Sequence, residues 1–180
     1  MPIYLIRHPP AVDVDGLCYG RLDVRVERKA TIAAAESIRG HFSTEALAAA
    51  AIYSSPSTRC LELARHLAAP RQPEPADDLA EMDFGQWQGR RWDAIARNEI
   101  DAWAQDVWNY RPGGGESAQM VASRWERWSD QVRQRHAGDV IAITHAGVIR
   151  VALACRGRTR DSQALGANIP FASIHRLDLG

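Results

Sequence analysis

Three short apolar runs, separated by helical patterns, set the strongest limit on how this chain can fold. Residues 2–6, 48–53 and 139–144 are each too short for an ordinary helix, and the apolar residues within them leave no polar face. Such runs are typical of strands that are buried on both faces of a sheet. The sequence therefore predicts an α/β three-layer sandwich, with a mostly parallel central sheet and helices on both faces.

Most of the remaining chain carries helical or irregular patterns. A weak strand is expected at 76–79 and an irregular segment at 81–89, while the alternation over 172–179 predicts a half-exposed, antiparallel edge strand. We expect a single domain over residues 1–180, with an insert at about 80–115. The expected helices cover 27–41, 57–69, 91–108, 116–136 and 148–155.

The charge balance and the cysteines exclude several classes of protein. Lys plus Arg and Asp plus Glu each total 22, so the chain lacks the basic excess of a typical nucleic-acid binder. No apolar stretch is long enough to span a bilayer, and no secretory signal is evident at the start. Cys18, Cys60 and Cys155 are widely spaced and form no zinc motif. We expect a cytoplasmic protein with reduced thiols and without metal, cofactor, nucleic-acid or membrane partners.

Each apolar run is followed by residues of types that often bind ligands or take part in catalysis. The first run is followed by Arg7-His8, the second leads through Ser54-Ser55-Pro56 to Arg59, and the third ends in Thr144-His145. In open parallel α/β sheets, ligands bind beyond the carboxyl ends of the strands. We therefore expect two histidines and two arginines, distant in sequence, to converge on one spot.

These residue types together indicate a phosphate site. The forked guanidinium of arginine matches a phosphate dianion, and helix N-termini at Ser57 and Ala146 would add backbone N–H donors. A neutral imidazole is a competent nucleophile near neutral pH. An acid is still needed to protonate the leaving alkoxide, and Glu81 is the best candidate.

Several segments, in their order along the chain, resemble the motifs of the histidine phosphatase superfamily, the phosphoglycerate-mutase-like group. The similarity covers most of the chain, from Pro2 to about Cys155. Leu5-Ile6-Arg7-His8 resembles the opening motif, residues 54–60 the second, residues 79–89 the acid-bearing segment, Pro112-Gly113-Gly114-Gly115-Glu116-Ser117 the stretch before the long helix, and Thr144-His145-Ala146-Gly147 the last motif.

The resemblance implies a role for each matching residue. His8 becomes the phosphorylated nucleophile, and Arg7, Arg59 and His145 become the phosphate pocket. Glu81 becomes the proton donor to the leaving oxygen and then the base that activates water. No metal or cofactor is implied.

Two positions depart from the family pattern. Pro9 stands where the family usually has glycine, and Val14 stands where asparagine is common. Proline has no N–H, so one or two donors of the phosphate loop are absent or are supplied by neighbouring residues.

Residues 18–23 and 81–89 are most similar to α-ribazole phosphatase-like members, which remove the 5′-phosphate from α-ribazole phosphate in cobalamin assembly. The resemblance implies a metal-independent phosphomonoesterase that acts on a small phosphorylated metabolite, with α-ribazole 5′-phosphate as a candidate.

Mutases of the family generally carry an extra insertion that this chain lacks. Two alternatives stay open: a mutase-type phosphotransferase and a catalytically silent phosphate-binding module. Monomer and homodimer are both compatible with the sequence.

Two further residues have both a functional and an ordinary interpretation. Arg21 either reaches the substrate or is an ordinary loop arginine. Trp87 lies in an aromatic-rich segment and either forms a wall that stacks on a substrate base or packs small helices against the sheet. The remaining histidines have no motif around them and are expected at the surface: His41, His66, His136 and His175.

Overall fold

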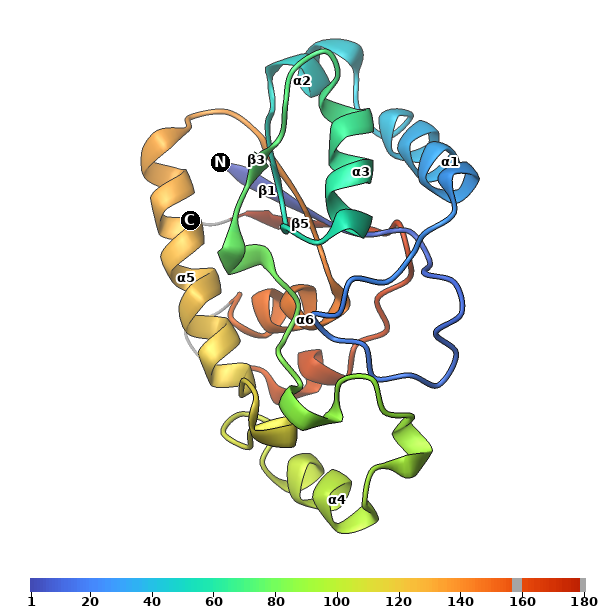
Figure 1. The fold of residues 1–180 in the computed structure, drawn as a ribbon. Coiled ribbons are helices and arrows are strands. Elements are labelled where there is room, and N and C mark those ends of the chain that lie inside the picture. Colours follow the sequence, from blue (N-terminus) through green and yellow to red (C-terminus); the bar gives the residue numbers. More distant parts are fainter. Residues whose placement is uncertain (157–159, 179–180) are drawn as a thin grey trace.

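A mixed sheet forms the centre of the molecule. The computed structural model describes residues 1–156 and 160–178. Within them the strand order is β3-β2-β4-β1-β5, and every neighbouring pair is parallel except β1 and β5, which are antiparallel (Figure 1). The strands are β1 (Pro2–Arg7), β2 (Ala51–Ser54), β3 (Glu74–Pro75), β4 (Val140–Thr144) and β5 (Ile174–Asp178).

Helices cover both faces of this sheet. One buried cluster joins α1 and α3 to one face, and a second joins α5 and α6 to the other (Figure 1). The predicted three-layer α/β sandwich with an antiparallel edge strand is thereby confirmed. The helices are α1 (Arg28–Arg39), α2 (Thr44–Ala49), α3 (Thr58–Ala68), α4 (Arg97–Gln105), α5 (Ala118–Arg135) and α6 (Ala146–Ala154).

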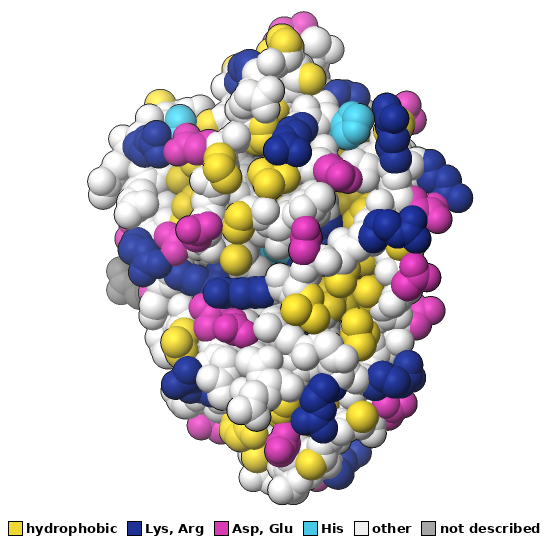
Figure 2. All heavy atoms as spheres, viewed as in Figure 1, with side chains coloured by type: hydrophobic (Ala, Val, Ile, Leu, Met, Phe, Trp, Pro, Cys, Tyr) yellow, Lys and Arg dark blue, Asp and Glu magenta, His cyan; other side chains and the backbone are white. Residues whose placement is uncertain are grey.

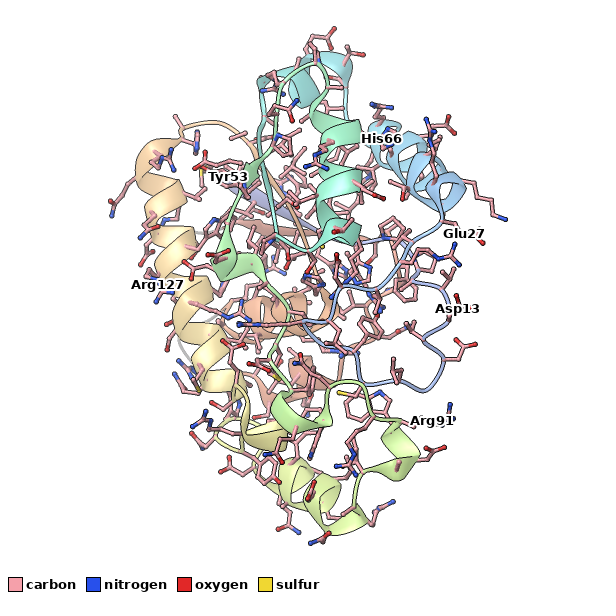
Figure 3. All side chains as sticks on the ribbon, viewed as in Figure 1. Asp13, Glu27, Tyr53, His66, Arg91 and Arg127 are labelled. Carbon is pink, nitrogen blue, oxygen red and sulfur yellow. The ribbon has the colours of Figure 1, made fainter. Side chains whose placement is uncertain are left out.

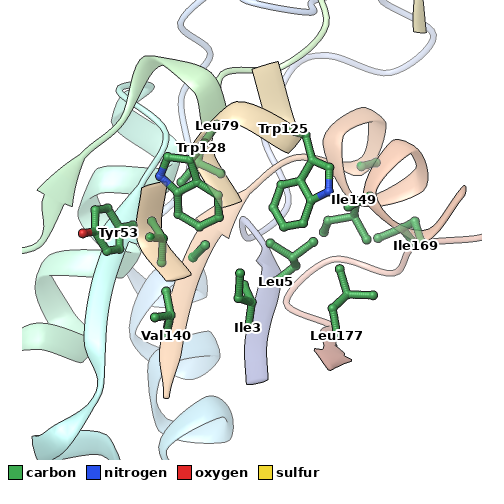
Figure 4. Packing of buried hydrophobic residues seen from close by; sticks show 14 residues of the cluster. Ile3, Leu5, Tyr53, Leu79, Trp125, Trp128, Val140, Ile149, Ile169 and Leu177 are labelled. Carbon is green, nitrogen blue, oxygen red and sulfur yellow. The ribbon is translucent and has the colours of Figure 1, made fainter. Parts of the chain in front are cut away.

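The helix α5 shows how the sequence pattern produces this packing. Ser117 caps its start by accepting a hydrogen bond from the N–H of Met120 at 3.3 Å. Buried residues at positions 121, 125, 128 and 132 then recur at helical spacing and form one apolar stripe. Trp125 and Trp128 lie over β1 and β4, where they pack near Leu5 and Val140 (Figure 4). Large aromatic side chains supply much of the apolar area that a core buries.

Two predicted elements near the second strand are wrong in extent. Residues 44–49 form α2 rather than the start of a strand, so β2 begins only at Ala51. Ser43 caps α2 by accepting from the N–H of Ala46 at 3.1 Å, and the following alanines continue the helix readily. Residues 77–79 form a 3-10 turn instead of a strand, and β3 is the short pair that precedes it.

The predicted helix over 91–108 is also shorter than expected. Its first part is not α-helical, because the N–H of Trp92 donates to the carbonyl of Gly16, in the loop after β1, at 2.8 Å. An α-helix therefore forms only in α4, after a 3-10 turn at Trp92–Ala94. The last predicted strand, 172–179, appears as β5, with position 179 outside the described residues. No helix in residues 1–156 and 160–178 combines the length and apolarity needed to cross a bilayer.

Candidate active site

The carboxyl ends of three neighbouring parallel strands bring the predicted site residues together. β1 and β4 are in register at Arg7 and Thr144, so His8 and His145 leave the sheet side by side. Their ring centroids lie 5.1 Å apart. Arg59 comes from the first turn of α3, directly after β2, and its Nη2 lies 3.2 Å from Nδ1 of His145. The expected convergence of two histidines with arginine is present.

His8 is held in one orientation by its own neighbour. Its Nδ1 lies 2.6 Å from the carbonyl oxygen of Pro9, and its backbone N–H donates to the carbonyl of Thr144 at 3.1 Å. A carbonyl oxygen only accepts, so the proton of the neutral imidazole lies on Nδ1. Nε2 then keeps a free lone pair, as a nucleophilic nitrogen requires. Pro9, which has no N–H to offer a ligand, contributes through its carbonyl instead.

Burial keeps both histidines neutral. Burial, followed by the charge of Arg59, lowers the pKa of His8 to about 3. Burial and the neighbouring His8 also hold the pKa of His145 well below its usual value. Both pKa values therefore lie well below neutral pH, so a neutral imidazole is available for attack without a prior deprotonation step.

We expect the protein to lose stability in mild acid because of these two histidines. Unfolding returns each pKa to about 6.5, so below that pH the unfolded chain binds protons that the folded chain does not. The free energy of unfolding should fall by up to about 1.4 kcal/mol per pH unit for each histidine between the two pKa values. Urea unfolding from about pH 7 to about pH 5 measures this slope.

His8→Asn should reduce that slope, whereas the control His41→Ala, which removes an exposed histidine, should leave it unchanged. An identical slope in the wild type and in His8→Asn would contradict a buried neutral His8.

The two arginines place positive charge beside His8 without a carboxylate to balance it. The two terminal nitrogens of Arg59 donate to the carbonyls of Leu22 and Gly20, at 2.8 and 2.7 Å. Arg7 donates to the carbonyl of Ile169 at 2.5 Å. Within the described residues, neither guanidinium forms an ion pair, and the buried Nε of each makes no hydrogen bond. Buried donors of this kind are rare unless a ligand uses them, so the pair is suited to bind an anion.

An aromatic ring that the sequence analysis missed completes this side of the pocket. The guanidinium of Arg7 lies over the ring of Phe171, 3.6 Å from its centroid, and the same ring lies 5.7 Å from the imidazole of His8. A cation that is stacked on an aromatic face keeps a fixed plane. Phe171 lies after the last motif, in the turn before β5, so no local pattern marked it.

His145 is fixed by Ser55 and Arg59. Its Nε2 lies 2.7 Å from Oγ of Ser55 at the end of β2. Arginine can only donate, so Nδ1 of His145 accepts from Arg59 and Nε2 carries the proton toward Ser55. Nδ1 of the ring therefore faces Arg59.

A carboxylate lies at the start of each of the two helices, Asp23 at α3 and Glu81 at α6. At α3, the N–H and the hydroxyl of Thr58 both donate to the carboxylate of Asp23, at 3.1 and 2.6 Å. This corrects the expectation that the helix start at Ser57 is open to a ligand, because a carboxylate from the loop already caps it. At α6, Ala146 is the first helical residue and immediately follows His145, as the sequence predicts.

Glu81 lies against the start of α6. Its Oε2 accepts from the N–H of Gly147 at 3.3 Å, and its Oε1 accepts from the N–H of Met82 at 2.9 Å. The carboxylate therefore binds a backbone N–H that lies only two residues along the chain from His145. The structure brings the predicted acid to the same edge of the sheet as the histidines.

A polar network fixes the acid-bearing segment from outside. Arg21 donates from Nε to the carbonyl of Glu81 and from Nη2 to Glu116, both at 2.9 Å. Glu116 also accepts from Arg124 and from the N–H of Asp83. Figure 2 shows Lys and Arg side chains gathered from α5 toward the middle of this face. Arg21 therefore positions the acid segment, and sequence analysis missed Glu116 and Arg124 in this role.

Glycines let the two halves of this segment approach closely. Gly113 has a φ of +58°, and a Cβ there would collide with the carbonyl of Phe84. A Cβ at Gly115 would collide with the carbonyl of Asp83. The glycines before the long helix are required because the backbone of 113–115 packs directly on the backbone that follows Glu81.

We expect Glu116→Gln to destabilise the protein by about 3 kcal/mol, because it leaves the buried Arg124 without its charge partner. The Glu116 and Arg124 side chains are only 14% and 8% exposed. Urea unfolding at neutral pH measures the loss. The matched control is Glu126→Gln on α5, the helix that carries Arg124. The Glu126 side chain is 51% exposed, and the effect should stay below about 0.5 kcal/mol. Equal effects of the two variants would argue against a supporting network.

Trp87 occupies the interior of the insert. Its side chain is 1% exposed, packs with Cys18 and Ile95, and donates from Nε1 to Glu99 at 2.8 Å. Both faces of the indole are used by the protein, which favours the packing interpretation over a substrate-stacking wall.

The remaining histidines lie apart from the four convergent residues. His66 lies on α3 toward α1 (Figure 3) and lines a surface hollow of about 510 Å³ with Arg39 and Arg65. His136 follows α5, and its Nε2 lies 2.9 Å from the hydroxyl of Tyr53. His41 is exposed, as expected.

Comparisons with known proteins agree with this geometry. The chain is 34% identical to a metal-independent phosphoserine phosphatase of Arabidopsis thaliana over 109 residues, which are 56% of this chain and 45% of that protein. It is 26% identical to phosphoserine phosphatase 1 of Hydrogenobacter thermophilus over 163 residues, 85% of this chain and 74% of that protein. The first match therefore spans less than half of the relative's length.

Solved structures share the fold over nearly the whole chain. The α-ribazole phosphatase from Shigella flexneri superposes with a TM-score of 0.82 at 22% identity, covering 100% of this chain and 91% of that chain. The mycobacterial glucosyl-3-phosphoglycerate phosphatase superposes with a TM-score of 0.83 at 23% identity, covering 98% and 92%. The model of the histidine phosphatase superfamily (branch 1) matches residues 3–180. This match, together with the paired histidines and arginines at the strand ends, shows that the chain belongs to the histidine phosphatase superfamily.

Proposed function

We propose that the protein is a metal-independent phosphomonoesterase that works through a phosphohistidine at His8. The observation that carries the proposal is the orientation of His8, whose Nδ1 is bound to the Pro9 carbonyl while Nε2 is free beside Arg59 and His145. A lone pair on a buried neutral imidazole, next to two guanidinium groups without carboxylate partners, suits attack on a phosphate dianion.

In the first step, Nε2 of His8 attacks phosphorus in line with the ester oxygen. The N–P bond forms as the P–O bond to the leaving alcohol breaks, and protonated Glu81 gives its proton to that oxygen. Negative charge on the equatorial oxygens is stabilised by Arg7 and Arg59.

In the second step, water attacks the phosphohistidine. The Glu81 carboxylate takes a proton from the water, the N–P bond breaks, and His8 recovers its neutral form as phosphate departs. Glu81 is protonated again and ready for the next turnover, so protons balance over the cycle.

His145 assists when the substrate is bound. A phosphate dianion near the ring favours the imidazolium, whose Nε2–H continues to bind Ser55. A proton on Nδ1 requires Nη2 of Arg59, which donates to that nitrogen in this structure, to turn to the phosphate. Ser55 therefore fixes which edge of the ring can serve the reaction.

The substrate is a small phosphorylated metabolite, with α-ribazole 5′-phosphate as a named candidate from the resemblance of residues 18–23 and 81–89. Support for the class comes from phosphatases among the similar proteins, which differ in their named substrates. Because one fold carries many specificities, the substrate must be assigned from the site itself. Support for a cytoplasmic setting comes from the three cysteines, none of which is in a disulfide within the described residues.

A steady-state assay with p-nitrophenyl phosphate in EDTA tests the proposal against its alternatives. We expect release of inorganic phosphate that chelator does not reduce. Turnover that depends on an organic acceptor would indicate a mutase-type phosphotransferase. Saturable binding of inorganic phosphate without turnover would indicate a silent binding module.

A further inference from the structure

A small, mostly apolar recess is lined by the two residues that bind the carboxylate of Glu81. Its volume is about 100 Å³, and its wall includes Met82 and Gly147, whose N–H groups hold the two oxygens of Glu81. If Glu81 protonates the leaving oxygen, the rest of the leaving alcohol must extend from that point. The recess is therefore placed to receive the part of the substrate that departs.

The wall of the recess is suited to a flat apolar group. Phe84 and Trp103 both line it and meet edge to face, with ring centroids 5.9 Å apart and an interplanar angle of 84°. Val107 and Leu165 form further apolar wall. An apolar cavity of about 150 Å³ can hold a benzene molecule. This recess is smaller, so it takes in the edge of one six-membered ring and leaves the rest of the ring outside.

One cation lies at the rim of this apolar wall. Arg150 lies three residues after Gly147 on α6, lines the recess, and donates from Nε to the carbonyl of Ala167 at 2.8 Å. Its two terminal nitrogens make no hydrogen bond or ion pair to any residue in 1–156 or 160–178. Burial and, to a smaller extent, the charge of Arg150 lower the pKa of Arg7. The charge of Arg150 therefore acts on a residue of the phosphate pocket. Such a guanidinium complements a second negative group on the substrate.

We propose that Phe84, Trp103 and Arg150 select the leaving group, and that preferred substrates are phosphomonoesters of alcohols carrying both a single six-membered ring and a carboxylate. The ring packs against the wall that Phe84 and Trp103 form together, while the carboxylate pairs with Arg150. This inference rests on the proposed phosphatase activity and narrows its substrate class. α-Ribazole 5′-phosphate, which carries a bicyclic base and no carboxylate, is then a poorer substrate than a phosphorylated phenyllactate.

Four esters of matched secondary alcohols separate the two contributions. Isopropyl phosphate has neither group, 1-phenyl-2-propyl phosphate has the ring, 2-phospholactate has the carboxylate, and 2-phospho-3-phenyllactate has both. For the wild type, we expect the ring and the carboxylate each to raise kcat/KM by about tenfold or more, since each recruits a contact that isopropyl phosphate cannot make.

Two variants assign each contribution to its residue. Arg150→Met should abolish the preference for carboxylate and keep the preference for the ring, while Trp103→Leu should do the reverse. Arg150→Gln and Phe84→Leu repeat each test should the first variant fold poorly. The matched control is Arg97→Met on α4, whose arginine is 87% exposed and lies outside the recess. It should behave as the wild type on all four esters.

The outcomes also separate this inference from the proposed function. Values of kcat/KM within about twofold for all four esters in the wild type would overturn the inference while leaving the phosphatase activity in place. An equal loss on all four esters in Arg150→Met would overturn it as well. No phosphate release from any ester, p-nitrophenyl phosphate included, would remove the proposed function and with it the inference.

Discussion

His8→Ala is expected to lower the rate of p-nitrophenyl phosphate hydrolysis by on the order of 10⁴- to 10⁶-fold. The size of the loss follows from the role of Nε2, because without it no N–P bond forms and the direct attack of water on the ester is far slower. The arginines remain in His8→Ala, so inorganic phosphate should still bind. Single-turnover and steady-state assays measure the rate, and thermal shift with phosphate measures the binding.

Rapid quench gives an independent measurement of the same step. The wild type should carry acid-labile, alkali-stable phosphate on the protein during turnover, and His8→Ala should carry none. His41→Ala provides a control histidine that is exposed and outside the site. A phosphoenzyme in His8→Ala, or a loss of rate below about tenfold, would contradict the assignment of the nucleophile.

Glu81→Gln is expected to slow phosphoryl transfer to His8 from alkyl phosphates by about 10²- to 10⁴-fold and that from p-nitrophenyl phosphate much less. An alkoxide is a poor leaving group that needs a proton as the P–O bond breaks, whereas p-nitrophenolate leaves without one. The glutamine keeps the shape of the side chain, but its one carbonyl oxygen can accept from only one of Gly147 and Met82. The difference between the two leaving groups, and not the absolute loss, therefore reports the proton. The burst-phase rate constants for formation of the phosphoenzyme from isopropyl phosphate and from p-nitrophenyl phosphate measure the difference, because the later attack of water is common to both.

A companion variant separates the presence of the acid from its position. A Cβ at Gly147 would collide with Oε1 of Glu81, and the flexible carboxylate is the part able to move. Gly147→Ala should therefore retain the fold and show the same dependence on the leaving group as Glu81→Gln, but with a smaller loss. Equal losses for both leaving groups in Glu81→Gln would argue that Glu81 is not the acid.

Several parts of the site were predictable because the local sequence determines them. Arg7-His8 and Thr144-His145 follow apolar runs whose strand character is unambiguous, and parallel neighbours place such strand ends at one edge. Arg59 follows from the same logic through β2 and α3. Glu81 came from the resemblance, since several nearby acids were equally plausible on composition alone.

Other parts were not predictable because they depend on distant contacts. Phe171 lies below Arg7 only because β5 runs back along β1. Asp23 closes the N-terminus of α3 from a loop that no pattern ties to that helix. The segment 91–94 loses its helical geometry to a hydrogen bond with Gly16, which a local propensity cannot foresee.

The amino-acid sequence by itself determined the α/β class, the strand ends and the residue types that meet there. The reason is that the spacing of apolar residues and the length of an apolar run are local properties of the sequence. The tertiary structure alone decided how the ring of His145 is oriented, which carboxylate lies at the start of each helix, and which aromatic side chain stacks on Arg7. These arrangements depend on groups far away along the chain, as for Arg7 and Ile169, which are 162 positions apart, and for Arg59 and Leu22, which are 37 apart. Their arrangement is fixed only when the sheet and its two helical layers have packed.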